Sequence, residues 1–451
     1  MGVRRDLALS LADGAGYGLM AGAAEMYLPA FALAIGIRPV LAGLVATAPL
    51  LAGGLLQLLA PRAIARTPSL RRWTATCSTI QALALVPLIA LALWGGHSET
   101  IVFGAAAVYW AAGMGQVAGW TPWVTNVVPV RIRGRFFGRR QGVVQTAMLI
   151  GLVGSGLALE AASGTPYLRA VYAAMFAVAA AARLVGAWAI ARQDGQVVRR
   201  PARRMRLRSI PPRLSGTPRA RLLGYLLAAL AATAISSPFL TPYLLVHEHI
   251  GYARFCVFTA AIVVAKVAAM PRFGRLIHRV GVRRVLTVCA FAIAPIPLLW
   301  LISSAFGWLL VIQLYAGVAW AGFELAMLMT LFDATDDAER TTIQSAFSAL
   351  QSLGTAGAGF IGGALLGALG DGHRAYMWLF ITSAFARLLA SSVLVRQLPK
   401  LLVRQLLPQA YSYARAAGAM MVGWRRGSLV VRRSGRSTSV GHASDTTSSS
   451  S

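Results

Sequence analysis

Five ionisable residues stand inside long apolar stretches of the chain, where charge is otherwise rare: Glu25, Lys266, Glu324, Arg183 and Arg387. A charged side chain at membrane depth is costly, so such residues pair with one another or mark the path of a solute or a proton. A carboxylate there can take up a proton in one state and release it in another, because burial and neighbouring charges alter its proton affinity. These residues are therefore suited to binding and proton exchange inside a membrane.

The two glutamates are the leading candidates for coupling or substrate binding. Glu25 lies near the middle of its apolar run, and Glu324 lies in the inner part of another. A structural pair or a satisfied polar contact is the alternative for each. For Arg183, Arg387 and Lys266 we expect a structural role, because long basic side chains can extend toward the lipid head groups.

Aromatic and amide side chains occur together on two of the runs. They are Gln116, Trp120, Trp123 and Asn126 at residues 101–130, with Tyr109 nearby, and Tyr315 and Trp320 at residues 306–332. Such side chains suit an organic solute and could form the walls of a binding cavity. Packing or lipid contact is the alternative, because Trp and Tyr are common near membrane interfaces.

The elements that position these residues are predicted to be transmembrane helices. Of the 451 residues, 57% are hydrophobic and 13% are charged, and the mean hydropathy is +0.64. A helix of about 20 apolar residues spans the hydrocarbon layer, and only helices or closed barrels satisfy every backbone group in lipid. No alternating strand pattern recurs, so the chain is predicted to be an all-α polytopic membrane protein. Twelve apolar runs meet the length requirement, at residues 11–36, 40–60, 73–94, 101–130, 142–162, 168–191, 222–246, 252–270, 285–304, 306–332, 343–369 and 375–395.

The formal net charge of +29 reflects orientation in a membrane rather than nucleic-acid binding. Arginines are concentrated in alternate short loops, which is the charge bias of cytoplasmic loops. Both termini are therefore predicted to be cytoplasmic, in a multi-pass protein of the inner membrane. We expect a small-molecule solute and membrane lipids as partners, and no nucleic acid.

No pattern in the sequence indicates catalysis. The three cysteines, Cys77, Cys256 and Cys289, all fall in apolar runs, so neither a disulfide framework nor a metal site is expected. There is no G-x-x-x-x-G-K-[ST] phosphate loop and no H-E-x-x-H zinc motif. We expect no catalytic residues, no cofactor and no metal, and a protein that is not an enzyme.

The chain divides into two similar halves. Tyr172, Phe176 and Arg183 recur 204 positions later as Tyr376, Phe380 and Arg387, which indicates an internal duplication. Residues 192–221 hold ten arginines and one acid and are predicted to form a solvated linker. The expected organisation is a six-helix half at 1–191, a basic cytoplasmic linker at 192–221, a second half at 222–396, and a basic, Ser-rich cytoplasmic tail at 397–451.

Residues 274–285 read GRLIHRVGVRRV, which resembles the loop motif G-x-L-x-D-R-x-G-R-R of the major facilitator superfamily. The matching positions are Gly274, Leu276, Arg279, Gly281, Arg283 and Arg284, while His278 stands where the family usually has Asp. The resemblance implies a twelve-helix fold of two pseudo-symmetric halves, with a central cavity lined mainly by spans 1, 4, 7 and 10. It also implies rocking between inward-open and outward-open states.

The loop after residue 332 is acidic on a face that is otherwise basic. In the fold that the resemblance implies, it lies near the motif, so we expect ion pairs from Asp333 or its neighbours to Arg275, Arg279 or Arg283 that close the cytoplasmic side. Together these features predict a secondary active transporter that moves a small organic solute by alternating access with a coupled proton. A non-transporting sensor or a lipid-handling scaffold of the same fold is the alternative.

Overall fold

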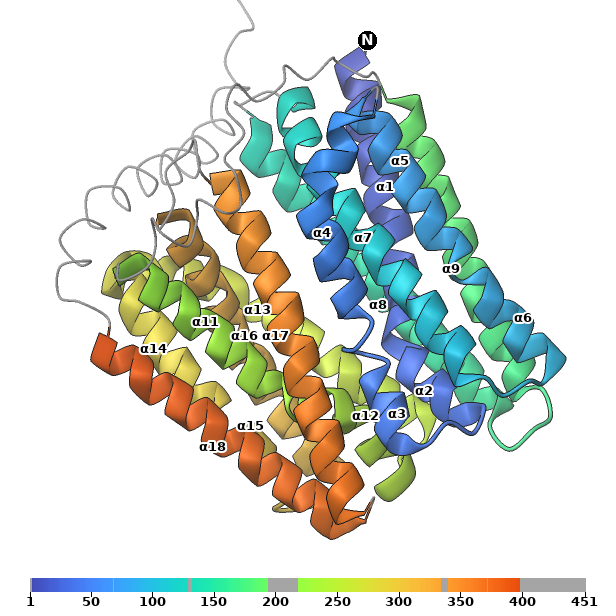
Figure 1. Ribbon diagram of the computed structural model, residues 1–451, viewed down its shortest axis with the longest axis vertical. Coiled ribbons are helices and arrows are strands. Elements are labelled where there is room, and N and C mark those ends of the chain that lie inside the picture. Colours follow the sequence, from blue (N-terminus) through green and yellow to red (C-terminus); the bar gives the residue numbers. More distant parts are fainter. Residues whose placement is uncertain are drawn as a thin grey trace, which may run out of the picture. The chain divides into compact units, whose positions relative to one another are not determined.

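The computed structural model describes residues 2–67, 69–128, 132–193, 218–333, 340–370 and 372–397. Every regular element in these ranges is helical, as Figure 1 shows. Residues 1–398 form one compact unit. Residues 194–217 of the predicted linker and all but the first residue of the predicted tail lie outside the described residues.

Ten segments of the described chain are long and apolar enough to cross a membrane. They correspond to ten of the twelve predicted spans; spans 1 and 2 are not among them, although Leu50–Ala60 of span 2 is a shorter apolar helix. The first six spans are α1 (Gly2–Ala23), η1 (Glu25–Tyr27) and α2 (Leu28–Ala34); α3 (Pro39–Leu44) and α4 (Leu50–Ala65); α5 (Leu70–Leu83) and α6 (Val86–Trp94); α7 (Glu99–Val127); α8 (Arg133–Ala162); and α9 (Leu168–Arg192).

The last six spans repeat this arrangement, and the two sets lie in separate groups in Figure 1. Span 7 is α11 (Pro218–Ala234), η4 (Ser237–Phe239), α12 (Leu240–Pro242) and the π-helical η5 (Tyr243–His247); span 8 is α13 (Tyr252–Val280); span 9 is α14 (Val282–Ile293) and α15 (Ile296–Leu299); spans 10 to 12 are α16 (Phe306–Asp333), α17 (Arg340–Leu369) and α18 (His373–Gln397). We call the end where α1 begins the N-terminal face and the other end the opposite face.

Local sequence determines where several helices begin and end. The Ser98 hydroxyl accepts a hydrogen bond from the Ile101 amide and caps α7, a role for which Ser is favoured. Gly281 separates α13 from α14 with φ of 89°, a region that residues with a Cβ rarely adopt. The glycine of the resemblance motif is therefore required by the backbone at this turn.

Corresponding spans of the two halves are interrupted at corresponding places. Span 1 changes from α1 to a 3-10 turn after Ala24, and span 7 does so after Ser236. Spans 3 and 9 are interrupted after Leu83 and Ile293. These matched interruptions agree with the internal duplication that the sequence predicts.

Aromatic packing is duplicated as well. In the first half, the Phe31 ring lies 5.3 Å from Tyr172 and 5.0 Å from Phe176 between centroids. The counterpart set in the second half consists of Tyr243, 5.4 Å from Tyr376 and 5.2 Å from Phe380. The repeated Tyr and Phe thus hold the span after each interruption in the same way, and the two halves are pseudo-symmetric.

Glycines allow α1 to approach its neighbours at backbone distance. Gly14, Gly18 and Gly22, spaced by four residues, face α8, and Gly16 faces the Ala182 carbonyl on α9. From the other side, a Cβ at Gly151 of α8 would lie 2.6 Å from the Leu19 carbonyl oxygen. Small residues at such positions are what permits close helix packing in lipid.

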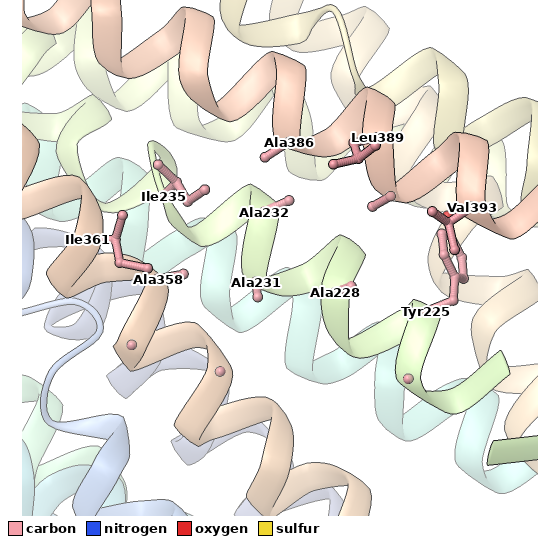
Figure 2. A pocket seen from close by; sticks show the side chains of 14 residues that line it. Tyr225, Ala228, Ala231, Ala232, Ile235, Ala358, Ile361, Ala386, Leu389 and Val393 are labelled. Atoms are coloured by element: carbon pink, nitrogen blue, oxygen red, sulfur yellow. The ribbon is translucent and has the colours of Figure 1, made fainter. Parts of the chain in front are cut away.

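The equivalent region of the second half is more open. An apolar groove of about 740 Å³ lies between α11, α17 and α18 (Figure 2), and Tyr225 supplies the one polar side chain among its fourteen lining residues. Figure 2 shows Ile361 of α17 and Leu389 of α18 at its walls. Because no charged side chain lines it, this groove does not hold the ionisable residues singled out in the sequence.

We predict that Gly151→Val lowers the melting temperature of the detergent-solubilised protein. The added side chain would meet the α1 backbone, and overpacking of this kind typically costs about 1–3 kcal/mol. Gly154→Val on the same helix is the matched control, because nothing lies within 4 Å of its Cβ position. Equal melting temperatures for the two variants in a thermal scan would contradict close α1–α8 packing.

Candidate functional site

Glu25 lies at the interruption of span 1, as the first residue of the η1 turn. Its Oε2 accepts a hydrogen bond of 2.8 Å from the Tyr109 hydroxyl of α7. Tyr109 is 3% exposed, whereas Glu25 is partly accessible. The structure thus joins a carboxylate of span 1 to a phenol of span 4, which sequence analysis had placed in the cavity wall.

Glu324 and Lys266 form an ion pair. The Lys266 Nζ lies 2.9 Å from Oε1 and 3.2 Å from Oε2 of Glu324, and links α13 to α16. Their side chains are 27% and 37% exposed, so the pair is open to its surroundings. The expectation that Lys266 extends alone toward the head groups is wrong, because a carboxylate 58 residues away in the sequence satisfies its charge within the protein.

A third set of charged groups lies in the first half and is centred on Asp13, which is buried and which the sequence analysis does not single out. Asp13 of α1 accepts from Arg140 of α8 at 2.7 Å and from Arg183 of α9 at 3.1 Å. The Nε of Arg183 also donates to Oε1 of Gln81 on α5 at 2.8 Å. The Asp13 carboxylate joins α1, α8 and α9, and Arg183 extends the network to α5. The position of Asp13 in an apolar run was the signal that could have revealed the network.

Arg140 carries this network to the edge of the half. Its guanidinium lies 4.2 Å from the centroid of the Trp120 ring on α7, within the range of a cation–π contact. Its Nε donates to the Ser10 carbonyl at 3.2 Å. Trp120 therefore packs on an arginine and on Phe137, with ring centroids 6.3 Å apart. The predicted cavity residue Trp120 belongs to the periphery of the charged network.

The duplicated arginines are buried, which corrects the expectation that they extend to the head groups. Arg183 is 0% exposed and Arg387 is 5% exposed. In place of a carboxylate, Arg387 uses the Ile293 and Thr233 carbonyls, at 3.3 and 3.4 Å, and the Ser236 hydroxyl, at 3.2 Å. The same repeated position is thus satisfied by charge in one half and by dipoles in the other.

Two of the other α7 residues that were predicted to line a cavity are buried. Trp123 is 1% exposed and Gln116 is 7% exposed. The side chain of Asn126 lies outside the described residues. In the described conformation, Trp123 and Gln116 are not open to a solute.

Of the two aromatic residues predicted on α16, Tyr315 does not form one wall with Glu324, whereas Trp320 lies on nearly the same side. Tyr315 precedes Glu324 by nine residues, or about two and a half helical turns, so the two project from opposite sides. The Tyr315 hydroxyl donates to the Ala292 carbonyl at 2.7 Å. Trp320, four residues before Glu324, lies on nearly the same side and packs against Phe323 at 5.6 Å. Trp320 is therefore the aromatic residue that accompanies the ion pair.

The predicted gate residues lie at the junction of α13 and α14, at the N-terminal face. Arg275, Arg279 and Arg284 are exposed, and Gly274 and Arg283 are partly exposed. The side chain of Asp333 and residues 334–339 lie outside the described residues, so the expected ion pairs stay a prediction. In the described ranges, no three His, Cys, Asp or Glu side chains are close enough to hold a metal ion.

Membrane-spanning helices in two pseudo-symmetric sets, with ionisable groups at their interruptions and contacts, define a polytopic membrane transporter. The family model described as Major Facilitator Superfamily matches residues 14–356, and the chain belongs to that superfamily. No curated protein matches the chain.

Solved structures of transporters share the fold. A point mutant of the nucleoside transporter NupG aligns with a TM-score of 0.71 at 12% identity, covering 88% of this chain and 100% of that one. A bacterial homologue of the iron transporter ferroportin, in an outward-facing state, aligns with a TM-score of 0.58 at 17% identity, covering 88% and 98%. At these identities the likeness concerns the fold alone.

We predict that Asp13→Asn destabilises the protein by about 3–5 kcal/mol, because it leaves the buried Arg183 guanidinium and the partly buried Arg140 guanidinium without their carboxylate. Adding Arg183→Gln to this variant should recover part of the loss, since one uncompensated charge is then removed. Thermal unfolding in detergent measures both effects, with Glu99→Gln as a control outside the network. A melting temperature for Asp13→Asn equal to that of the control would contradict this account.

Proposed function

We propose that this transporter moves a small organic solute across the inner membrane by alternating access, coupled to a proton that Glu25 carries. The observation that supports this best is the position of Glu25 at the interruption of span 1, partly accessible and joined to span 4 by the Tyr109 hydroxyl at 2.8 Å. A group that binds and releases a proton during transport has to be both deep in the membrane and reachable.

The partners of the carboxylates distinguish Glu25 from the others. Asp13 has two guanidinium groups, and Glu324 has the Lys266 ammonium. The partner of Glu25 among the described residues is a neutral phenol. Its negative charge is therefore left to be compensated by a proton or by a cationic part of a solute, as expected for a coupling residue.

We propose that the Lys266–Glu324 pair, which lies in the second half, binds the solute. The pair is partly open, and ionisable groups in membrane segments face a bundle interior or a water-filled space rather than lipid. A solute with a charged group can replace the partner of like charge in an ion pair without leaving the other uncompensated. Trp320 lies beside the pair and offers an apolar surface to such a solute.

The described conformation is proposed to be closed at the opposite face, which we assign to the periplasm. The halves are in contact there, because a Cβ at Gly43 of α3 would lie 2.5 Å from Cδ1 of the Phe239 ring. A second contact between the halves is at Gly359 of α17, where an added Cβ would meet the Thr47 side chain. The N-terminal face, where α1 begins, is then cytoplasmic, and for both termini, the 192–221 linker and the 397–451 tail we propose the cytoplasmic side from the arginine bias.

The cytoplasmic gate is proposed to form when Asp333 or its neighbours pair with the arginines after Gly274. Arg275 and Arg279 are exposed in the described conformation and so are accessible to a partner. Ion pairs that form in one state and separate in the other bias the equilibrium between the two states.

We predict that Glu25→Gln abolishes solute flux driven by a pH gradient in proteoliposomes, because the amide cannot carry the proton. Tyr109→Phe should reduce this flux and leave it measurable, since it removes the hydrogen bond and keeps the carboxylate. Glu99→Gln is the matched control, and a panel of metabolites and amphipathic drugs supplies the solutes. Full gradient-driven flux by Glu25→Gln would exclude the proton role.

Absence of flux for any solute with the folded wild-type protein would instead favour a sensor or a lipid-handling scaffold. Counterflow of solute without a pH gradient separates a loss of coupling from a loss of solute binding. Glu25→Gln should retain counterflow if the residue acts on the proton alone.

We predict that Arg279→Glu slows transport severalfold, because it places like charges opposite the acidic loop. A second change, Asp333→Arg, should restore part of the rate if these two residues pair. Initial rates of uptake measure both variants, and Arg38→Glu, in a loop of the opposite face, is the control. Unchanged transport by Arg279→Glu would contradict the gate.

A further inference from the structure

The two halves meet along a seam between α8 and α13. The Tyr27 hydroxyl of η1 donates to the Leu152 carbonyl at 2.7 Å, and the Cys256 thiol of α13 lies 3.6 Å from the same oxygen. One turn further along α8, a Cβ at Gly156 would lie 2.5 Å from the Cβ of Cys256. The Tyr27 and Phe255 rings are 5.9 Å apart. Residues of the first half thus pack directly on α13 of the second.

At the outer end of this seam, a carboxylate of the first half caps a helix of the second. Glu160 lies in the last turn of α8, and its Oε2 accepts a hydrogen bond of 3.0 Å from the Ala253 amide at the start of α13. The first amide groups of a helix have no partner within it, and its N-terminus carries a partial positive charge. The N-cap residue of α13, Gly251, has no side chain to fill that role.

Gly251 also provides the space that the carboxylate occupies. A Cβ at this position would lie 2.9 Å from Oε2 and 3.1 Å from Oε1 of Glu160. Such separations are too short for an ordinary contact, so a side chain at residue 251 would displace the carboxylate from the helix end. The glycine and the glutamate, 91 residues apart, therefore form one complementary contact between the halves.

We propose that Glu160 and the N-terminus of α13 form a latch that holds the opposite face closed, and that opening of this face breaks it. The inference rests on the alternating access proposed above. A charge-assisted hydrogen bond is stronger than a neutral one, so its loss shifts the equilibrium toward the open state. Glu160 is exposed at the surface, so its separation from α13 requires no rearrangement within either half.

A native cysteine lies beneath the latch and reports its opening. Cys256 is 3% exposed and contacts the other half through Leu152. Cys77 and Cys289 are also buried, yet their close neighbours Gly115 and Gly322 belong to the same half as each cysteine. Separation of the halves at the opposite face should therefore expose Cys256 and leave Cys77 and Cys289 protected.

The test is the rate at which a membrane-impermeant maleimide labels Cys256 of the full chain in cells or proteoliposomes, read by peptide mass spectrometry. We expect Glu160→Ala to raise this rate about tenfold, and Glu160→Gln to raise it less, because an amide oxygen still accepts the Ala253 bond. Gly251→Ala should raise the rate with the charge retained. Glu99→Gln is the matched control, because it also deletes a carboxylate at the opposite face but at a position away from the seam.

The latch would be overturned if Cys256 were labelled at the wild-type rate in Glu160→Ala and Gly251→Ala while both variants had the melting temperature of the control. Equal increases at Cys77 and Cys289 would also overturn it, because they indicate general loosening. The labelling does not depend on transport, so the latch and the proposed function can fail separately. Selective labelling of Cys256 without flux would keep the latch and reject solute transport.

Discussion

A bilayer offers no water to a broken helix, and the arrangement of polar residues in this protein follows from that constraint. Spans 1 and 7 are interrupted within their length, so backbone groups there need partners from side chains or neighbouring helices. At span 7, Arg387 supplies donors to the Thr233 carbonyl and the Ser236 hydroxyl, and Ser236 also bonds to Ser383. The interruptions therefore gather polar groups at the depth where a transporter requires them.

The first half provides polar partners at its interruption in a different way. Its interruption carries Glu25 with the Tyr109 hydroxyl as partner, and its repeated arginine, Arg183, is paired with Asp13, which lies earlier, within α1. One half thus contains buried charges that compensate one another, and the other a buried arginine held by dipoles. The two halves share the aromatic packing that fixes the helices and differ in their charges.

Packing of α1 and α11 reflects the same divergence. Glycines bring α1 against the backbones of α8 and α9, so Asp13 is sealed away from lipid and water. Around α11, the equivalent helices leave a groove lined mainly by alanine and glycine (Figure 2). Burial of a charged network demands close packing, because an uncompensated or hydrated charge inside the bundle would destabilise it, whereas an apolar groove within a membrane does not expose polar groups.

The sequence by itself determined the number and approximate bounds of the spans, the duplication and the glycine at the turn before α14. Each of these features depends on local hydropathy, on repeated residues or on a backbone angle. Such properties can be recognised in short stretches of sequence. It also singled out Glu25 and Glu324, because charge in an apolar run is visible without a structure. Tertiary structure alone decided the partners: Tyr109 lies 84 residues from Glu25, Lys266 lies 58 from Glu324, and Arg183 lies 170 from Asp13. Such contacts depend on the rotation and depth of helices packed together, which no periodicity within one helix encodes.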